Sequence, residues 1–179
     1  MITLRCTQKL LKRLGETPFE EGHAKSRLGD WHGKEVFAGR RRAFLFVNDE
    51  TSISVILPAK KGVFQEQFQT RYAGILYRRG VSAEVIATEI EAAKHLAITR
   101  SNSRRHLGVL NEMAFQYQVT LDYKPEYSDE QIENRLMDTL VGAVGSRDFY
   151  YPWKQLDRAL GDGVIEREPR SRENVPSEE

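Results

Sequence analysis

Two consecutive β-rich runs constrain the fold of this chain more than any other feature. Residues 43–48 read AFLFVN and residues 51–57 read TSISVIL, with only Asp49 and Glu50 between them. Runs rich in β-branched and aromatic residues, joined by a short polar link, are typical of a β-hairpin. The first run is apolar at successive positions, which indicates a strand covered on both faces. We therefore expect a central hairpin at about 43–57.

Segments with helical periodicity follow the hairpin and predict the layers that cover it. Apolar residues recur at helical spacing over 64–80 and from 103 to 117. Ser82 and Ser128 each precede another such segment and are typical N-cap residues. We expect the helix that starts at Ser128 to end near Gly145. The chain is therefore predicted to be α+β, with a small sheet that includes the hairpin, packed by about five helices.

Capping and turn residues predict the start of the chain. A short strand at 2–5 leads to Thr7, the N-cap of a predicted helix that Gly15 ends. Residues 16–34 contain Gly, Pro and several charges, so we interpret them as a surface loop. A further strand is expected at 95–99.

The length of 179 residues predicts one domain, which we place at 1–160. Residues 161–179 are rich in charge, and we interpret them as a disordered tail. Cys6 is the single cysteine, and no apolar stretch reaches the roughly 18 residues that a membrane span needs. The first residues have no apolar signal core. We expect a bacterial, cytoplasmic protein with no membrane attachment.

Charge is divided unevenly along the chain. Residues 1–111 carry 19 Lys or Arg and 11 Asp or Glu, whereas residues 112–179 carry 8 and 15. If the basic clusters share one face, they attract a polyanion with strong salt dependence. Two other interpretations stay open. The cations are solvated helix ends and strand edges, or the basic part pairs with the acidic part of the same chain or of a second subunit.

Motifs with strict spacing exclude several chemistries. The sequence holds no C-x-x-C, H-x-x-x-H or D-x-D pattern and no phosphate-binding glycine loop, so we predict no metal site and no cofactor. The histidines are isolated in sequence, at His23, His32, His95 and His106. Cys6 precedes a predicted helix and is either an activated nucleophile or a small buried hydrophobe.

Two polar segments are candidates for binding a phosphate or a carboxylate. The segment 5–9 lies where a strand ends and a helix begins, so backbone N–H groups, a hydroxyl and two cations can meet there. The segment 102–106 also precedes a helix and carries two arginines. The structural alternative is that these residues cap helices, pair with acids or face solvent. The predicted ligand-binding residues are Arg5, Thr7, Lys9, Arg104, Arg105 and Asn111.

Several segments, taken in order, resemble an uncharacterised bacterial domain family. They are RCTQKLLKRL at 5–14, LGDW at 28–31, LFVN at 45–48, LGVLNEMAF at 107–115 and the Tyr151-Pro152 region. The stretch at 107–115 also resembles part of plasmid-encoded ORF-3-like proteins. The resemblance spans nearly all of 1–160 and implies no activity. It implies recurring polar positions at Arg5, Thr7, Lys9, Asn48, Arg104 and Asn111.

These features predict a binding function. We expect the basic part of the chain to bind nucleic acid or another phosphate-rich ligand, in a mobile-element, defence or toxin–antitoxin setting. One alternative is an enzyme that processes a phosphodiester or a nucleotide with the same residues. The other is a protein–protein interaction module or homodimer without a ligand.

Overall fold

The computed structural model describes residues 1–15, 26–60, 63–142 and 148–161, and every structural statement below concerns these residues. The strands are β1 (Ile2–Cys6), β2 (Trp31–Ala38), β3 (Arg41–Asn48), β4 (Ser54–Pro58), β5 (Leu96–Arg100), β6 (Val141–Gly142) and β7 (Phe149–Tyr150). The helices are α1 (Gln8–Leu14), α2 (Phe64–Arg79), α3 (Ala83–Ala93), α4 (Arg104–Tyr123), α5 (Asp129–Met137) and α6 (Pro152–Leu160). The fold is α+β, as the sequence predicts.

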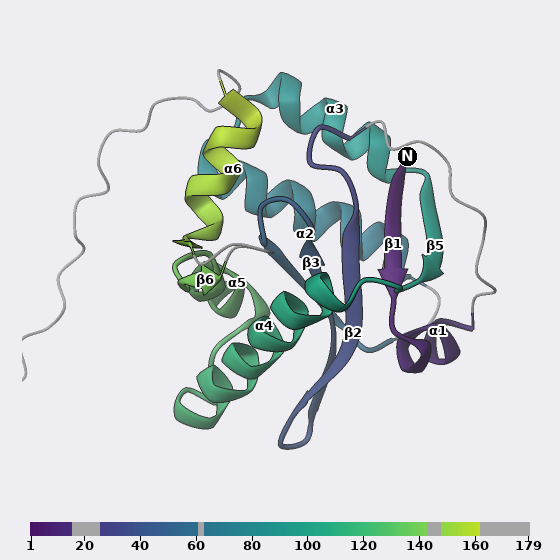
Figure 1. The fold of residues 1–179 in the computed structure, drawn as a ribbon, viewed down its shortest axis with the longest axis vertical. Coiled ribbons are helices and arrows are strands. Elements are labelled where there is room, and N and C mark those ends of the chain that lie inside the picture. The colour runs from purple at the N-terminus through teal and green to yellow at the C-terminus, as the bar shows by residue number, and fades with distance from the viewer. Residues whose placement is uncertain (16–25, 61–62, 143–147, 162–179) are drawn as a thin grey trace, which may run out of the picture.

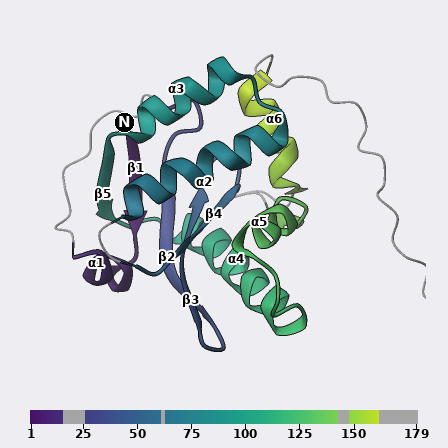
Figure 2. The same ribbon diagram turned by 180° about the vertical axis from the view of Figure 1, so that it is seen from behind.

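The main sheet has five strands in the order β4-β3-β2-β1-β5. Strand β1 pairs in parallel with both β2 and β5, whereas β2, β3 and β4 form an antiparallel meander. Helix α4 covers the face of the sheet that is nearer the viewer in Figure 1, and α5 packs beside α4 against the edge strand β4. Helices α2 and α3 cover the opposite face, seen in Figure 2. Strands β6 and β7 form a separate small hairpin.

Strand β3 is buried on both faces, which confirms the expected central hairpin. Phe44 and Phe46 pack in the core that contains the apolar side chains of α2. Leu45 and Val47 pack in the core that contains those of α4. Each of these side chains is at most 3% exposed, and burial of an apolar side chain of this size contributes roughly 1.5–3 kcal/mol. The continuous apolar run therefore reflects two-sided burial.

The predicted helix caps are present. Thr7, Ser82 and Ser128 each accept a hydrogen bond from the backbone N–H three residues further on. Ser103 does the same at the start of α4. Gly15 ends α1 with a φ of 72°, a left-handed conformation that glycine adopts without a steric penalty.

The predicted loop at 16–34 is wrong at its end, because β2 begins at Trp31. Gly33 and the charged residues after it do not give this segment the composition of a strand. Its place beside β1 comes from parallel pairing with a segment distant in sequence, which local composition does not encode. Residues 16–25 of that loop lie outside the described residues.

The predicted end of the helix that starts at Ser128 is also wrong. Helix α5 ends at Met137 rather than near Gly145, which itself lies outside the described residues. Leu140, at a helical spacing from the buried face, is 51% exposed. The chain turns after Met137 and enters the β6–β7 hairpin instead. Residues 162–179 of the predicted tail lie outside the described residues as well.

The β2–β3 hairpin extends beyond the rest of the sheet in both ribbon views (Figures 1 and 2). This extension exists because β2 and β3 pair over their full lengths, whereas β1 reaches only to Cys6.

None of the helices formed by the described residues has the length and apolar character needed to cross a membrane.

Candidate functional site

A groove lies along the part of β2 that β1 does not cover. The register pairs β1 with Trp31–Gly33, so within the described residues Lys34–Ala38 have no strand partner on that side. Helix α4 borders this edge and leaves a cavity of about 420 Å³. We call it the β2-edge groove. Its lining consists of Lys34, Glu35, Val36, Phe37, Asn111, Ala114, Phe115 and Gln118.

Three cations that do not themselves line the groove surround the buried carboxylate of Glu35, which does. The side chain of Glu35 is fully buried. Its carboxylate oxygens lie 3.5 Å from Nζ of Lys9 and 3.2 Å from Nε of Arg13. The Nε of Arg42 lies 3.5 Å from the same group. Among the described residues, one carboxylate is shared by three cations, so this part of the cluster carries a net positive charge.

Lys34 adds a further positive charge beside this cluster. Its Nζ donates a hydrogen bond of 2.7 Å to Oδ1 of Asn111 on α4. Burial and, after it, the charge of Lys9 lower the pKa of Lys34. The two ammonium groups are therefore close enough to repel each other. An anion that binds between them removes this repulsion.

Two aromatic rings in the groove are accessible to solvent. Phe37 is 39% exposed and Phe115 is 59% exposed. Nζ of Lys9 lies 4.3 Å from the centroid of the Phe37 ring, and the guanidinium carbon of Arg42 lies 5.1 Å from it. Cations over an aromatic face are held in place by the ring quadrupole. The groove thus combines positioned cations with exposed rings.

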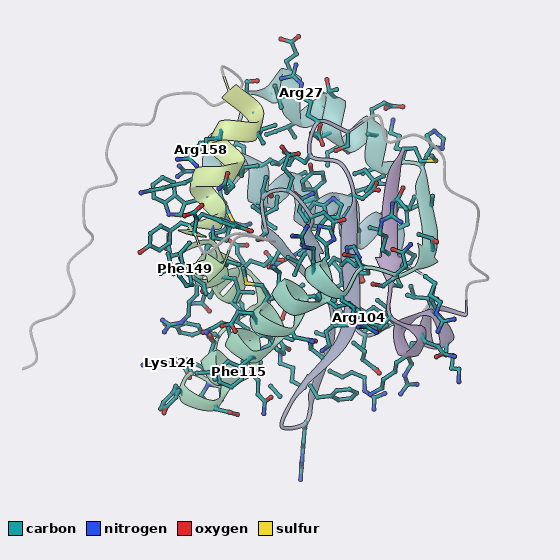
Figure 3. All side chains as sticks on the ribbon, viewed as in Figure 1. Arg27, Arg104, Phe115, Lys124, Phe149 and Arg158 are labelled. Carbon is teal, nitrogen blue, oxygen red and sulfur yellow. The ribbon has the colours of Figure 1, made fainter. Side chains whose placement is uncertain are left out.

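The start of α4 extends the positive surface. Arg104 and Arg105 are exposed, and neither makes an ion pair with any described residue. Figure 3 shows Arg104 at the beginning of α4 and Phe115 toward the other end of the helix. One helix therefore presents both the arginines and the groove.

The structure gives Arg5 and Thr7 structural contacts away from the lining of the groove. Nη2 of Arg5 donates to Oδ2 of Asp30 at 2.9 Å. The Thr7 hydroxyl accepts from the backbone N–H of Leu10, as a helix cap does. Arg5 therefore pairs with an acid and Thr7 caps a helix, as the structural alternative in the sequence analysis expects.

Asn48 has a structural environment too. It is buried, its Nδ2 donates to the carbonyl of Leu28 at 2.7 Å, and its Oδ1 accepts from the backbone and the hydroxyl of Thr51. The hydrogen bonds of Asn48 therefore link the turn between β3 and β4 to the segment before β2.

The structure therefore separates the six predicted binding residues. Asn111 lines the groove and Lys9 lies beside Glu35, one of its lining residues, whereas the two arginines of α4 lie at the start of that helix. Lys34, Glu35 and Phe37 were not identified from the sequence, because they occur in a segment interpreted partly as loop. The signal that was present is the strand-favouring Trp, Val and Phe of β2.

A second cluster of titratable side chains brings together histidines far apart in sequence. Nδ1 of His32 lies 2.5 Å from Oδ1 of Asp49. The rings of His32 and His106 stack with centroids 4.8 Å apart and planes 20° from parallel. Burial lowers the pKa of His106, against the opposing charge of Asp49. The spacing rules applied to the sequence could not detect this convergence.

Cys6 does not have the environment of an activated nucleophile. It is completely buried, and burial raises the pKa of its thiol to about 12. A thiolate is therefore disfavoured, and Cys6 serves as a small apolar residue in the core.

Comparison with known proteins gives one family match. The model of a family described as Domain of unknown function (DUF6933) matches residues 3–155. No similar curated protein and no similar solved structure was found.

Proposed function

The chain belongs to the family Domain of unknown function (DUF6933), and from that starting point we propose that it binds single-stranded nucleic acid in the β2-edge groove. The observation that carries this proposal is the excess of positive charge around Glu35. Lys9, Arg13 and Arg42 share its single carboxylate. A polyanion supplies the negative charge that this cluster lacks.

Within the part of the chain that the structure describes, acidic residues of the C-terminal part pair with other basic residues but not with Lys9, Arg13 or Arg42. Arg41 pairs with Asp129 at 2.6 Å, and Arg79 pairs with Asp157. Arg71 pairs with Glu133 at 2.6 Å. The interpretation that the acidic part folds back on the basic part thus holds for cations near α5 and α6. At the groove, the pairs found among the described residues all use Glu35.

Exposed aromatic rings favour a nucleic acid over a polyanion without bases. Proteins that bind single strands combine a positively charged groove with aromatic side chains on which bases stack. Phe115 supplies such a ring on α4, and Phe37 supplies a second one on β2. Lys34 and Asn111 lie in the same groove and can donate hydrogen bonds to a backbone phosphate or a base.

The proposal is tested by fluorescence anisotropy with a labelled single-stranded oligonucleotide of about 20 nucleotides. The wild-type protein is compared with the double variant Lys9→Ala/Lys34→Ala. Its charge-matched control is Lys12→Ala/Lys94→Ala, which changes two exposed lysines that neither line the groove nor pair with Glu35 among the described residues. Titrations run from about 50 to about 200 mM salt, because the slope of log K against log salt becomes shallower by about 0.7 for each phosphate that a variant no longer neutralises.

We expect wild type and control to bind with a steep salt dependence, and the groove variant to bind more weakly with a shallower slope. Equal affinity of groove variant and control would show that the groove is not the binding surface. A duplex of the same sequence and poly-glutamate are run in parallel. Tighter binding of poly-glutamate than of the oligonucleotide would replace the nucleic acid by an acidic polypeptide as the partner. The mobile-element, defence or toxin–antitoxin setting remains a prediction that this assay does not address.

A further inference from the structure

Three side chains from separate parts of the chain lie close together outside the β2-edge groove. His32 lies on β2, Asp49 follows β3, and His106 lies in the first turn of α4. One ligand atom from each residue lies within 4.8 Å of the others. Two imidazoles and one carboxylate form a donor set that suits divalent transition metals.

Each histidine has one ring nitrogen held by an oxygen atom. Nδ1 of His32 lies 2.5 Å from Asp49, and Nδ1 of His106 lies 2.8 Å from Oγ of Ser103. Partners of this kind fix the orientation of the ring and, when Nδ1 carries the proton, leave the lone pair of Nε2 available. Ser103 is itself fixed as the N-cap of α4.

The remaining nitrogen of His32 is unusual for a buried polar atom. His32 is 1% exposed, and its Nε2 has no hydrogen-bond partner among the described residues. A buried polar atom without a partner costs about 1–3 kcal/mol. A bound cation supplies the missing partner.

We infer that His32, Asp49 and His106 form a binding site for one divalent transition metal ion such as Zn²⁺. Either Asp49 coordinates the ion directly, or it orients His32 in the carboxylate–histidine–metal arrangement. Both arrangements require the same three residues. His106 and Asp49 are only partly buried, so an ion can reach them from solvent.

The charges around the cluster permit a cation. Arg5 on β1 and Arg105 on α4 both act electrostatically on His106. The guanidinium of Arg5 is paired with Asp30 at 2.9 Å. The carboxylate of Asp49 supplies one negative charge within the cluster. With two or three protein ligands, at least one coordination position is left for water, as in sites that are not purely structural.

The test uses Co²⁺ and Zn²⁺ with tag-free protein that has been stripped with a chelator. Co²⁺ reports its coordination through visible absorption, and Zn²⁺ affinity is measured by competition with a chromophoric chelator. His106→Ala removes a ligand on a partly exposed surface, so the fold is expected to persist. His95→Ala removes an exposed histidine outside the cluster and is the matched control.

Ser103→Ala provides a second, graded variant. It removes the partner of His106 Nδ1 and also a helix cap. Ser82→Ala removes the equivalent cap from α3 and leaves the cluster intact, so it isolates the effect of the cap.

We expect wild type and His95→Ala to bind one equivalent of either metal with the same affinity. Ser103→Ala should lose roughly 10- to 100-fold in affinity, the usual cost of removing an orienting partner, and His106→Ala should lose more. Ser82→Ala should bind as wild type does. Equal binding by wild type and His106→Ala, or loss of binding only in His95→Ala, would overturn the inference. The assay contains no nucleic acid, so its outcome is independent of the function proposed for the groove.

Discussion

Nζ of Lys34 donates a hydrogen bond to Oδ1 of Asn111 at 2.7 Å, and this contact joins β2 to α4 across the β2-edge groove. Because Asn111 is neutral, the contact leaves the charge of Lys34 uncompensated. The chain therefore holds Lys34 in place without reducing its attraction for an anion. This distinguishes Lys34 from Lys9, which lies near Glu35.

The charge at position 111 should control anion binding. Asn111→Asp keeps the size of the side chain but pairs Lys34 with a carboxylate. At an exposed groove such a charge changes the binding free energy by about 1 kcal/mol, or about fivefold in Kd. Anisotropy titration with the oligonucleotide should show this weakening. Asn134→Asp adds the same charge on α5, beside Arg78, and should leave the affinity unchanged. Equal weakening in both variants would indicate a long-range effect of net charge.

Phe115 should contribute to binding but not to folding. It is 59% exposed, so Phe115→Ala should change the free energy of unfolding by less than about 0.5 kcal/mol. If a base stacks on its ring, the same change should weaken oligonucleotide binding by about 1–3 kcal/mol. Phe149→Ala, which removes a 68% exposed ring from β7, is the control for binding. An oligonucleotide affinity that is the same in all three proteins would show that no base stacks on α4.

The sequence was sufficient for elements whose signals are local. The two-sided burial of β3 follows from its continuous apolar run, and the caps at Ser82 and Ser128 follow from one residue and the periodicity behind it. Strand β2 was missed in part, because its identity depends on pairing between β1 and β3. The β2-edge groove was hard to predict for the same reason, because its central residues lie on β2.

The histidine cluster was beyond local reasoning for a similar reason. His32 lies on β2 and His106 lies on α4, and several secondary-structure elements separate them in the sequence. The connection from β5 to α4 is what places His106 against His32. The prediction that no metal site exists rested on spacing within motifs, and spacing carries no information about such a crossover.

Glu133 should make stability depend on pH. Burial raises its pKa to about 7, despite the opposing charge of Arg71 and a hydrogen bond from the Ile56 N–H. Because the pKa in the unfolded chain is near the ordinary 4.5, the folded state binds the proton more tightly. The contribution of this proton to stability is complete below the unfolded pKa and is lost as pH rises to about 7.

Urea unfolding between about pH 5 and pH 8 tests this linkage. The difference in unfolding free energy between wild type and Glu133→Gln should fall as pH rises, by at most about 1.4 kcal/mol per pH unit, and become constant above about pH 7. The glutamine variant lacks the titrating group, so other titrations cancel in the difference. A difference that grows with pH would mean that the ion pairs with Arg71 and Arg78 outweigh burial.

Glu89 should be essential for anchoring the segment before β2. Its side chain is fully buried and accepts hydrogen bonds from the Ser26 hydroxyl, the Arg27 backbone N–H and the Tyr72 hydroxyl. Glu89→Ala leaves these donors without their acceptor, and each unsatisfied buried donor costs about 1–3 kcal/mol. Thermal unfolding should show a large loss of stability for Glu89→Ala and almost none for the exposed Glu91→Ala. Similar small losses in both variants would show that Glu89 does not anchor this segment.

Two glycine substitutions should have opposite effects on stability. A Cβ added at Gly33 would lie 2.5 Å from the ring of Phe46, which is fully buried between β3 and α2 and has little room to move. Overpacking of this kind typically costs about 1–3 kcal/mol. A Cβ added at Gly108 meets no atom within 4 Å, and α4 is helical there. Because alanine favours a helix over glycine by up to about 1 kcal/mol, Gly108→Ala should stabilise the protein. Urea unfolding of both variants measures the two changes. Stabilisation by Gly33→Ala would mean that the Phe46 ring can move aside, and destabilisation by Gly108→Ala would mean that this position on α4 tolerates no side chain.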